Sequence, residues 1–180
     1  MTWRRIATYY ALALVLGGYF FLFERSSGKQ RSVTTTGVAE ERRFLPIKRE
    51  DIREMTLRRT NGTVTFRWED QGWKVIEPAG VQVPAALATS FIENLTPVKE
   101  VQVMDAAPKD LAPYGLDHPD TTVVLKGEGG KPLATVFLGS YNPTSSAVYA
   151  RKDNAPQVVL LGSSAKYYEE LIFGQTGVGK

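Results

Sequence analysis

An uncharged apolar segment near the start of the chain constrains its fold more than any other feature. The segment runs from Ile6 to Phe23 and contains no Asp, Glu, Lys or Arg. A helix of that length spans roughly 27 Å at about 1.5 Å per residue, close to the ~30 Å hydrocarbon core of a bilayer. Residues 6–23 are therefore predicted to form a transmembrane helix, with the lipid bilayer as the first expected partner.

Two other interpretations of this segment stay open. In a cleaved signal peptide, Arg4 and Arg5 would form the basic region, but a cleavage site needs small residues. Bulky residues and then the charged Glu24 and Arg25 end this segment instead. In a buried core helix, an apolar surface on all sides would need a core that so short a chain lacks at its start. A retained anchor agrees best with the sequence.

Three tyrosines and two glycines of the anchor are candidate contacts with other helices. Tyr9, Tyr10 and Tyr19 carry amphipathic rings, which favour the membrane interface or helix packing. Gly17 and Gly18 leave a flat surface that a second helix can approach closely, although merely tolerated glycines are the alternative. We expect other subunits of a membrane complex to contact the anchor here.

The rest of the chain divides by composition. Basic residues flank the anchor almost equally, but an amino terminus this short usually stays in the cytoplasm, so the remainder is expected outside it. Small polar residues after the anchor are typical of a linker. The expected parts are a cytoplasmic amino terminus (1–5), the anchor (6–23), a juxtamembrane linker (24–43), an extracytoplasmic α+β domain (44–173) and a flexible tail (174–180).

The composition excludes several classes of function. The chain has 180 residues, of which 43% are hydrophobic, so the part after the linker can bury a core of its own. It has no cysteine, which excludes disulfides, thiol catalysis and metal sites built from thiolates. The formal net charge is +3, and no basic stripe with interleaved aromatic residues occurs, so nucleic-acid binding is not expected.

Hydrophobic periodicity after the linker predicts an antiparallel meander followed by a helix. Apolar residues alternate with polar ones over 64–68, and the preceding Asn61-Gly62 pair is typical of a tight hairpin turn. A further strand is expected over 73–76. Over 84–95 the period changes to that of a helix with one apolar stripe, and a short strand at 101–103 follows.

The second half repeats this plan of several strands and then one helix. Ser163 or Ser164 is expected to cap the helix, which runs to about Phe173. Its core-facing side chains are expected to be Tyr167, Leu171 and Ile172. The strands before it are expected over 121–126, 133–138, 147–151 and 157–161.

The predicted fold class is therefore α+β. After a single amino-terminal transmembrane helix, we expect an antiparallel β-meander, in one sheet or more, with two main helices. Because each half reads as several strands and then a helix, a duplicated meander-plus-helix unit is an open alternative.

No cluster of residues predicts a catalytic, metal or cofactor site. His118 is the only histidine and cannot hold a metal by itself. Residues 174–180 fit the pattern G-x-x-x-x-G-K of a phosphate-binding loop. Such a loop lies between a strand and a helix, whereas here the preceding element is expected to be a helix, so no bound nucleotide is expected. Glu169 and Glu170 can pair with Lys166 along their helix. The sequence does not predict that the two carboxylates are buried to different extents, as acid–base catalysis would need.

One stretch resembles a known family. Residues 110–119 read D-L-A-P-Y-G-L-D-H-P, which is similar to the D-L-x-x-Y-G-L-x-x-P signature of the domain-of-unknown-function 4340 (DUF4340) family. The likeness covers roughly 45–173. It implies a domain tethered by one amino-terminal helix to the bacterial inner membrane and lying in the periplasm, in some members beside ABC-type or gliding-motility transport components. It implies no catalytic residues. Physically, Tyr114 and Leu116 should enter the core while Gly115 supplies a positive φ.

The expected function is non-catalytic. The chain would present an extracytoplasmic interaction domain as an accessory or structural subunit of a larger membrane complex for transport, motility or energy transduction. Tyr141 and Asn142 are the candidate surface contacts of the domain. The alternative is a binding module for a lipid or an envelope polymer, with the 141–143 loop and the Trp68/Trp73 hairpin lining one groove. An enzyme is the third hypothesis.

Overall fold

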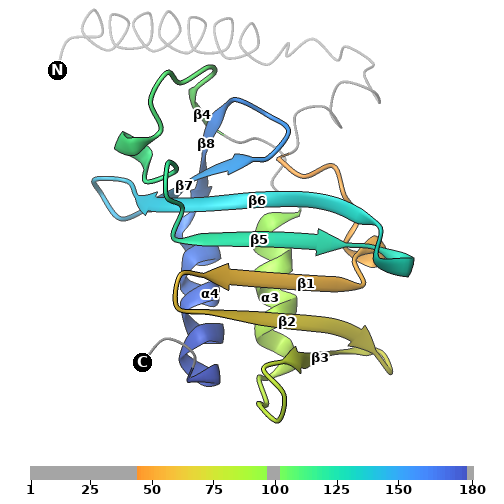
Figure 1. Cartoon of the computed structure of the whole chain (residues 1–180). Helices are drawn as coiled ribbons and strands as arrows, with labels where there is room; N and C mark the ends of the chain where they lie inside the picture. Colours follow the sequence, from red (N-terminus) through yellow and green to blue (C-terminus); the bar gives the residue numbers. More distant parts are fainter. Residues whose placement is uncertain (1–43, 97–101, 178–180) are drawn as a thin grey trace, which may run out of the picture. The chain divides into compact units, whose positions relative to one another are not determined.

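The computed structural model describes residues 44–96 and 102–177, which form a single antiparallel sheet with two α-helices (Figure 1). The sheet has eight strands in the order β3-β2-β1-β5-β6-β7-β8-β4. The predicted α+β class is therefore confirmed. The strands are β1 (Glu54–Arg59), β2 (Gly62–Glu69), β3 (Gly72–Glu77), β4 (Gln102–Asp105), β5 (Thr121–Lys126), β6 (Pro132–Tyr141), β7 (Ala147–Lys152) and β8 (Val158–Gly162). The helices are α3 (Ala85–Leu95) and α4 (Ser163–Thr176), with short 3-10 turns η1 (Arg49–Asp51), η2 (Ala112–Tyr114) and η3 (Glu128–Gly130).

None of the helices within residues 44–96 and 102–177 combines the length and the apolar character of a membrane span. The predicted anchor lies outside the described residues and stays a prediction. The same holds for its candidate packing residues, which are Tyr9, Tyr10, Gly17, Gly18 and Tyr19.

Along the central strands, successive side chains alternate between the two faces of the sheet. Met55 and Leu57 of β1 pair with Phe66 and Val64 of β2, and all four are fully buried on the face that the helices cover. The residues between them point to the opposite face. The predicted hairpin joins β1 and β2, but its two turn residues are Thr60 and Asn61, because Gly62 already pairs with Arg59 as the first residue of β2.

The two meanders join at the centre of the sheet. β1 pairs antiparallel with β5, so the strands β3-β2-β1 lie on one side of this seam and β5-β6-β7-β8 on the other. β4 breaks the regular pattern, because it follows α3 in the chain but pairs with β8 at the far edge. Each meander is followed by one helix, and the duplication itself stays a hypothesis.

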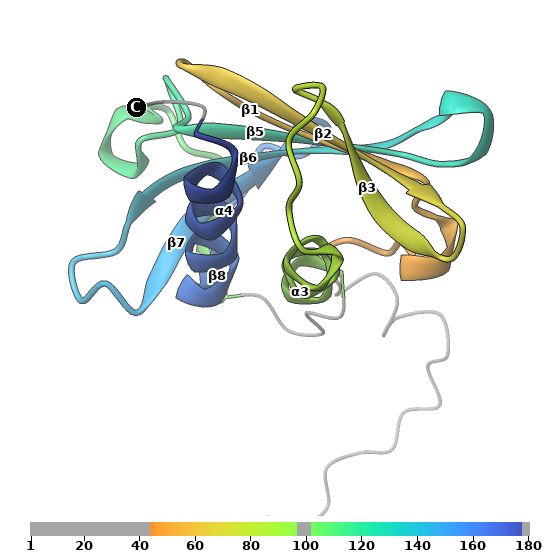
Figure 2. The ribbon, with the colours of Figure 1, turned by 90° about the horizontal axis from the view of Figure 1, so that it is seen from below.

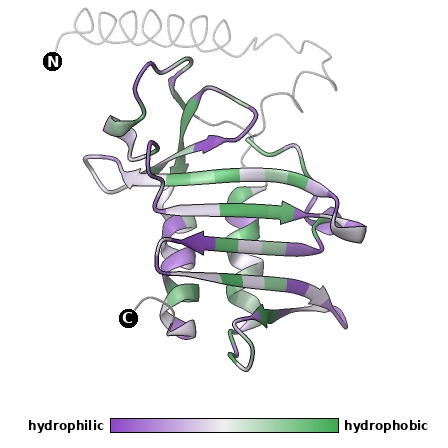
Figure 3. Cartoon of the chain, viewed as in Figure 1, coloured by the Kyte–Doolittle hydropathy of each residue, from purple (hydrophilic) through white to green (hydrophobic). Residues whose placement is uncertain are grey.

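Both helices cover the same face of the sheet (Figure 2). The predicted apolar stripe of α3 is confirmed, since Ala88, Phe91, Ile92 and Leu95 are fully buried. Apolar residues gather along the middle of the central strands, while the strand ends are more hydrophilic (Figure 3). The core therefore lies between the middle of the sheet and the two helices.

The bounds of α4 differ from those predicted. Gly162 occupies the N-cap position and no side chain caps the helix, so the predicted cap by Ser163 or Ser164 is wrong. Both serines lie inside the first turn, because β8 passes directly into the helix. The helix continues to Thr176 rather than ending near Phe173.

The face that α4 turns to the core also differs from the prediction. Tyr167 is 55% exposed and Leu171 is only half-buried, so their predicted places in the core are wrong, whereas Ile172 is fully buried as predicted. The buried stripe instead runs through Ala165 and Glu169. These positions are four residues apart and share one helix face with Ile172.

The D-L-A-P-Y-G-L motif packs on the sheet through a glycine. Gly115 has φ 63° and closes η2, as predicted. Leu116 is buried, whereas Tyr114 is only half-buried, with its ring 5.1 Å from that of Tyr149. A Cβ at Gly139 of β6 would lie 2.2 Å from the Tyr114 carbonyl oxygen. The motif can therefore lie on β6 only because position 139 has no side chain.

Candidate functional site

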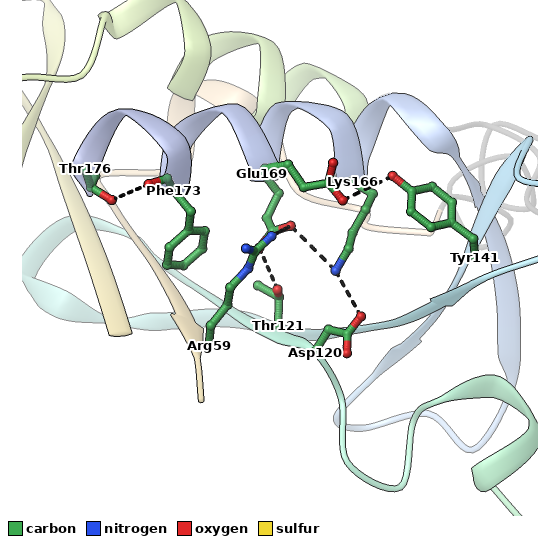
Figure 4. Close-up of polar contacts among 9 residues, drawn as sticks. Arg59, Asp120, Thr121, Tyr141, Lys166, Glu169, Phe173 and Thr176 are labelled. Atoms are coloured by element: carbon green, nitrogen blue, oxygen red, sulfur yellow. Dashed lines mark hydrogen bonds and ion pairs between the residues drawn. The ribbon is translucent and has the colours of Figure 1, made fainter. Parts of the chain in front are cut away.

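A carboxylate on α4 lies completely inside the protein. Glu169 has 0% of its surface exposed and accepts hydrogen bonds from Nε and Nη2 of Arg59, each at 2.5 Å (Figure 4). The Thr121 hydroxyl donates a third bond to Glu169 Oε1 at 2.6 Å. One side chain of α4 is thus bonded to the end of β1 and to the start of β5, and the paired charges offset the cost of burying the carboxylate.

A buried lysine extends this cluster toward the surface. The side chain of Lys166 is only 6% exposed, and its Nζ lies 3.2 Å from Asp120 Oδ2 and 3.7 Å from Glu169 Oε2. The predicted pairing of Lys166 with Glu169 along the helix is present. Asp120 is well exposed, so the chain of charges leads from the core to solvent.

A polar hollow of about 530 Å³ opens beside the cluster. Its charged walls carry two cationic and two anionic side chains, so they give no net preference for a charged ligand. The hollow is therefore suited to small polar groups rather than to a strongly charged one. Its lining residues are Arg59, Thr60, Asn61, Asp120, Lys166 and Glu170.

A second hollow, of about 420 Å³, lies where tyrosines of β6 and α4 meet. Tyr141 is 37% exposed and Tyr167 is 55% exposed. The Tyr141 hydroxyl donates to Glu170 Oε1 at 3.4 Å, which links this hollow to the first one. Partial burial, and then the negative charge of Glu170, raise the pKa of Tyr141 above its usual value of 10.0. The other lining residues are Ser145, Ser163 and Ser164.

The two predicted surface contacts of the domain have different surroundings. Tyr141 reaches the surface beside α4, where Tyr167 joins it. The Asn142 side chain instead holds its own loop, because its Oδ1 accepts from the backbone N–H groups of Ser146 and Ala147. Tyr141 is thus open to a partner, whereas the Asn142 amide serves the turn between β6 and β7.

The groove predicted between the 141–143 loop and the tryptophan hairpin does not form. Trp68 ends β2 and Tyr141 ends β6, and these strands run in opposite directions with β1 and β5 between them. The two aromatic groups therefore lie at opposite ends of the sheet (Figure 1). Trp68 and Trp73 meet edge to face at 5.4 Å, beside a separate hollow of about 260 Å³ that Arg49 and Arg53 also line.

Sequence reasoning missed the burial of Glu169. Glu169 and Glu170 are adjacent, yet one is fully buried and the other is exposed. The signal was present, since Ala165, Glu169 and Ile172 are spaced as one helix stripe. Their different burial does not make an acid–base pair, because cations and a hydroxyl already occupy both Glu169 oxygens.

Within residues 44–96 and 102–177, no three acidic, histidine or cysteine side chains are grouped so that they could hold a metal ion. The model of one protein family, described as Domain of unknown function (DUF4340), matches residues 73–171. The resemblance suggested by the D-L-A-P-Y-G-L motif is therefore confirmed. No curated protein and no solved structure matches the chain.

Proposed function

The chain belongs to the DUF4340 family, and from this starting point we propose that it is a non-catalytic, single-pass protein of the bacterial inner membrane. Its periplasmic domain would bind other subunits of a larger complex for transport, motility or energy transduction. The apolar segment 6–23 supports the membrane part of the proposal, because its length and lack of charge match a bilayer span.

The observation that carries the binding part is the pair of exposed tyrosines at the second hollow. Tyr141 and Tyr167 come from different elements and frame one concave surface. Tyrosine is enriched where proteins bind proteins, since its ring buries a large area and its hydroxyl keeps a polar contact. The bonds of Glu169 hold α4 against the sheet, so this surface is already ordered before a partner arrives.

Co-purification from native membranes tests this proposal. The full-length protein, extracted in a mild detergent, is expected to bring down its partner subunits in fixed stoichiometry by mass spectrometry. The double variant Tyr141→Ala/Tyr167→Ala should lose them. Tyr141→Phe, which keeps the ring, and Lys74→Ala, on β3 away from this surface, should retain them. A wild-type protein that runs alone as a monomer would refute the subunit role.

A second candidate function is binding of a lipid or an envelope polymer. The hollow beside Trp68 and Trp73 favours it, because aromatic rings and the guanidinium of Arg53 can hold apolar and polar parts of one ligand. Tryptophan fluorescence of the full-length protein, titrated with lipid vesicles or peptidoglycan fragments, tests it. A saturable change that Trp68→Ala abolishes would support this function, and the absence of any saturable change would exclude this hollow as its site.

A further inference from the structure

The sheet face opposite the helices carries a row of side chains that crosses four strands. Arg58 of β1 lies opposite Thr122 of β5 in the backbone register. Thr122 lies opposite Phe137 of β6, which in turn lies opposite Arg151 of β7. Figure 1 looks onto this face, with both helices behind the sheet. We name Arg58, Thr122, Phe137 and Arg151 the outer row.

Arg151 lacks the partners that a guanidinium normally has. Its charged group lies 5.0 Å from the centre of the Phe137 ring. Its Nε is buried and has no hydrogen-bond partner in the part of the chain that the structure describes, where Arg151 also makes no ion pair. Buried N–H groups without an acceptor are uncommon, because each costs desolvation without compensation. The covered Nε cannot itself be reached from outside, so an acceptor from another molecule would have to bind the terminal nitrogens of this half-buried side chain.

Arg58, at the other end of the row, is exposed and also makes no ion pair among residues 44–96 and 102–177. The cations further along the same face are different. Arg67 lies 3.2 Å from Glu54, and Lys126 lies 2.7 Å from the same carboxylate. Among the cations that the described strands place on this face, only Arg58 and Arg151, at the two ends of the outer row, make no ion pair with described residues.

The spacing of the two arginines defines what can bind them. Three strand spacings separate Arg58 from Arg151, or roughly 14 Å at about 4.8 Å each. An extended chain advances about 3.3 Å per residue and turns alternate side chains to one side, so its residues i and i+4 are about 13 Å apart on one face. Residue i+2 then lies above Thr122 and Phe137.

We propose that the outer row binds an extended acidic segment of a partner protein, with carboxylates at positions i and i+4 and an apolar side chain at i+2. Each carboxylate would accept hydrogen bonds from one guanidinium, and Phe137 would contact the apolar residue. The inference rests on the proposed role as a subunit and adds the chemistry of one partner segment. The outer row and the tyrosine surface lie on opposite sides of the sheet.

A synthetic peptide, Gly-Asp-Ser-Leu-Ser-Asp-Gly, tests this inference on the full-length protein in detergent by fluorescence anisotropy. Binding is expected to weaken about tenfold or more in Arg58→Gln and in Arg151→Gln, since each loses charged hydrogen bonds. Arg67→Gln removes a cation from the same face and should change binding less than about twofold. Arg151→Lys should recover part of the loss, because it keeps the charge without the planar fork. Thermal melts confirm that each variant is folded.

Three results would each overturn the inference. The first is equal binding of a peptide with Asn in place of Asp, and the second is an equal loss of binding in Arg67→Gln. The third is binding to phosphatidylglycerol vesicles with the same dependence on Arg58 and Arg151, in the absence of peptide binding, which would assign the row to a membrane surface. If partners still co-purify through the tyrosines in any of these cases, the subunit role stands and only the acidic segment is wrong.

Discussion

Glu169 joins α4 to two strands through a single carboxylate. Arg59 comes from β1 and Thr121 from β5, and both bond to Glu169, which is fully buried. Loss of the carboxylate would leave the guanidinium of Arg59 and the ammonium of Lys166 without their buried partner. Such broken pairs cost far more than the intact pair contributes.

Replacement of Glu169 by alanine is therefore expected to lower the free energy of unfolding by about 3–5 kcal/mol. The control is Glu170→Ala, one residue along the helix and exposed, which should change it by less than about 0.5 kcal/mol. Urea unfolding followed by tryptophan fluorescence measures both. Similar small changes in the two variants would show that the buried pair is dispensable.

The ion-paired carboxylate of Glu54 is expected to make the stability of the fold depend on pH. The hydrogen bond from Lys126, with a smaller contribution from Arg67, lowers the pKa of Glu54 below its usual value of 4.5. Because the folded pKa is the lower one, the stabilisation is fully present above the unfolded pKa and is lost as the pH falls through the folded pKa. The stability difference between wild type and Glu54→Gln should thus shrink below about pH 4.5. Urea unfolding between pH 7 and pH 3 measures it, and a constant difference would contradict this assignment.

At the scale of elements, the η2 motif and β6 depend on one missing side chain. The Tyr114 carbonyl oxygen occupies the place that a Cβ of Gly139 would need. Gly139→Ala is expected to destabilise the protein by about 1–3 kcal/mol, because backbone rather than a flexible side chain must move. Gly162→Ala is the control, since nothing lies within 4 Å of its added Cβ, and it should have little effect. Thermal unfolding compares the two, and equal melting temperatures would refute the contact.

Single elements could be predicted where local pattern decides them. The hairpin between β1 and β2 and the apolar stripe of α3 follow from the turn residues at 60–62 and from the helical period, and both elements are confirmed. The position of Tyr167 could not be predicted, because an amphipathic ring fits either side of a helix and the packing of α4 on the sheet decides it. Helical spacing places Glu169 on the buried stripe of α4, but the partner that lets a carboxylate lie there, Arg59, is distant in the sequence and no local pattern identifies it.

At the scale of the whole molecule, the order of the strands could not be predicted from periodicity. Neighbouring strands such as β1 and β2 pair through a short turn, which the sequence shows. The pairing of β1 with β5 and of β4 with β8 joins segments far apart in the chain. An alternating pattern states which face of a strand is buried but not which strand lies beside it.

The place of β4 has a consequence for synthesis of the chain. β4 is made directly after α3, yet its pairing partner β8 comes more than fifty residues later, next to the final helix. The separation between Arg59 and its partner Glu169 is larger still, at 110 residues. Pairings this distant slow folding, because long loops must close before the contacts form. The β4 edge of the sheet can therefore form only after β8 has been made, whereas the β3 edge needs no residue beyond β5. A chain cut before α4 would keep the pairing of β4 with β8 but would leave Arg59 without Glu169.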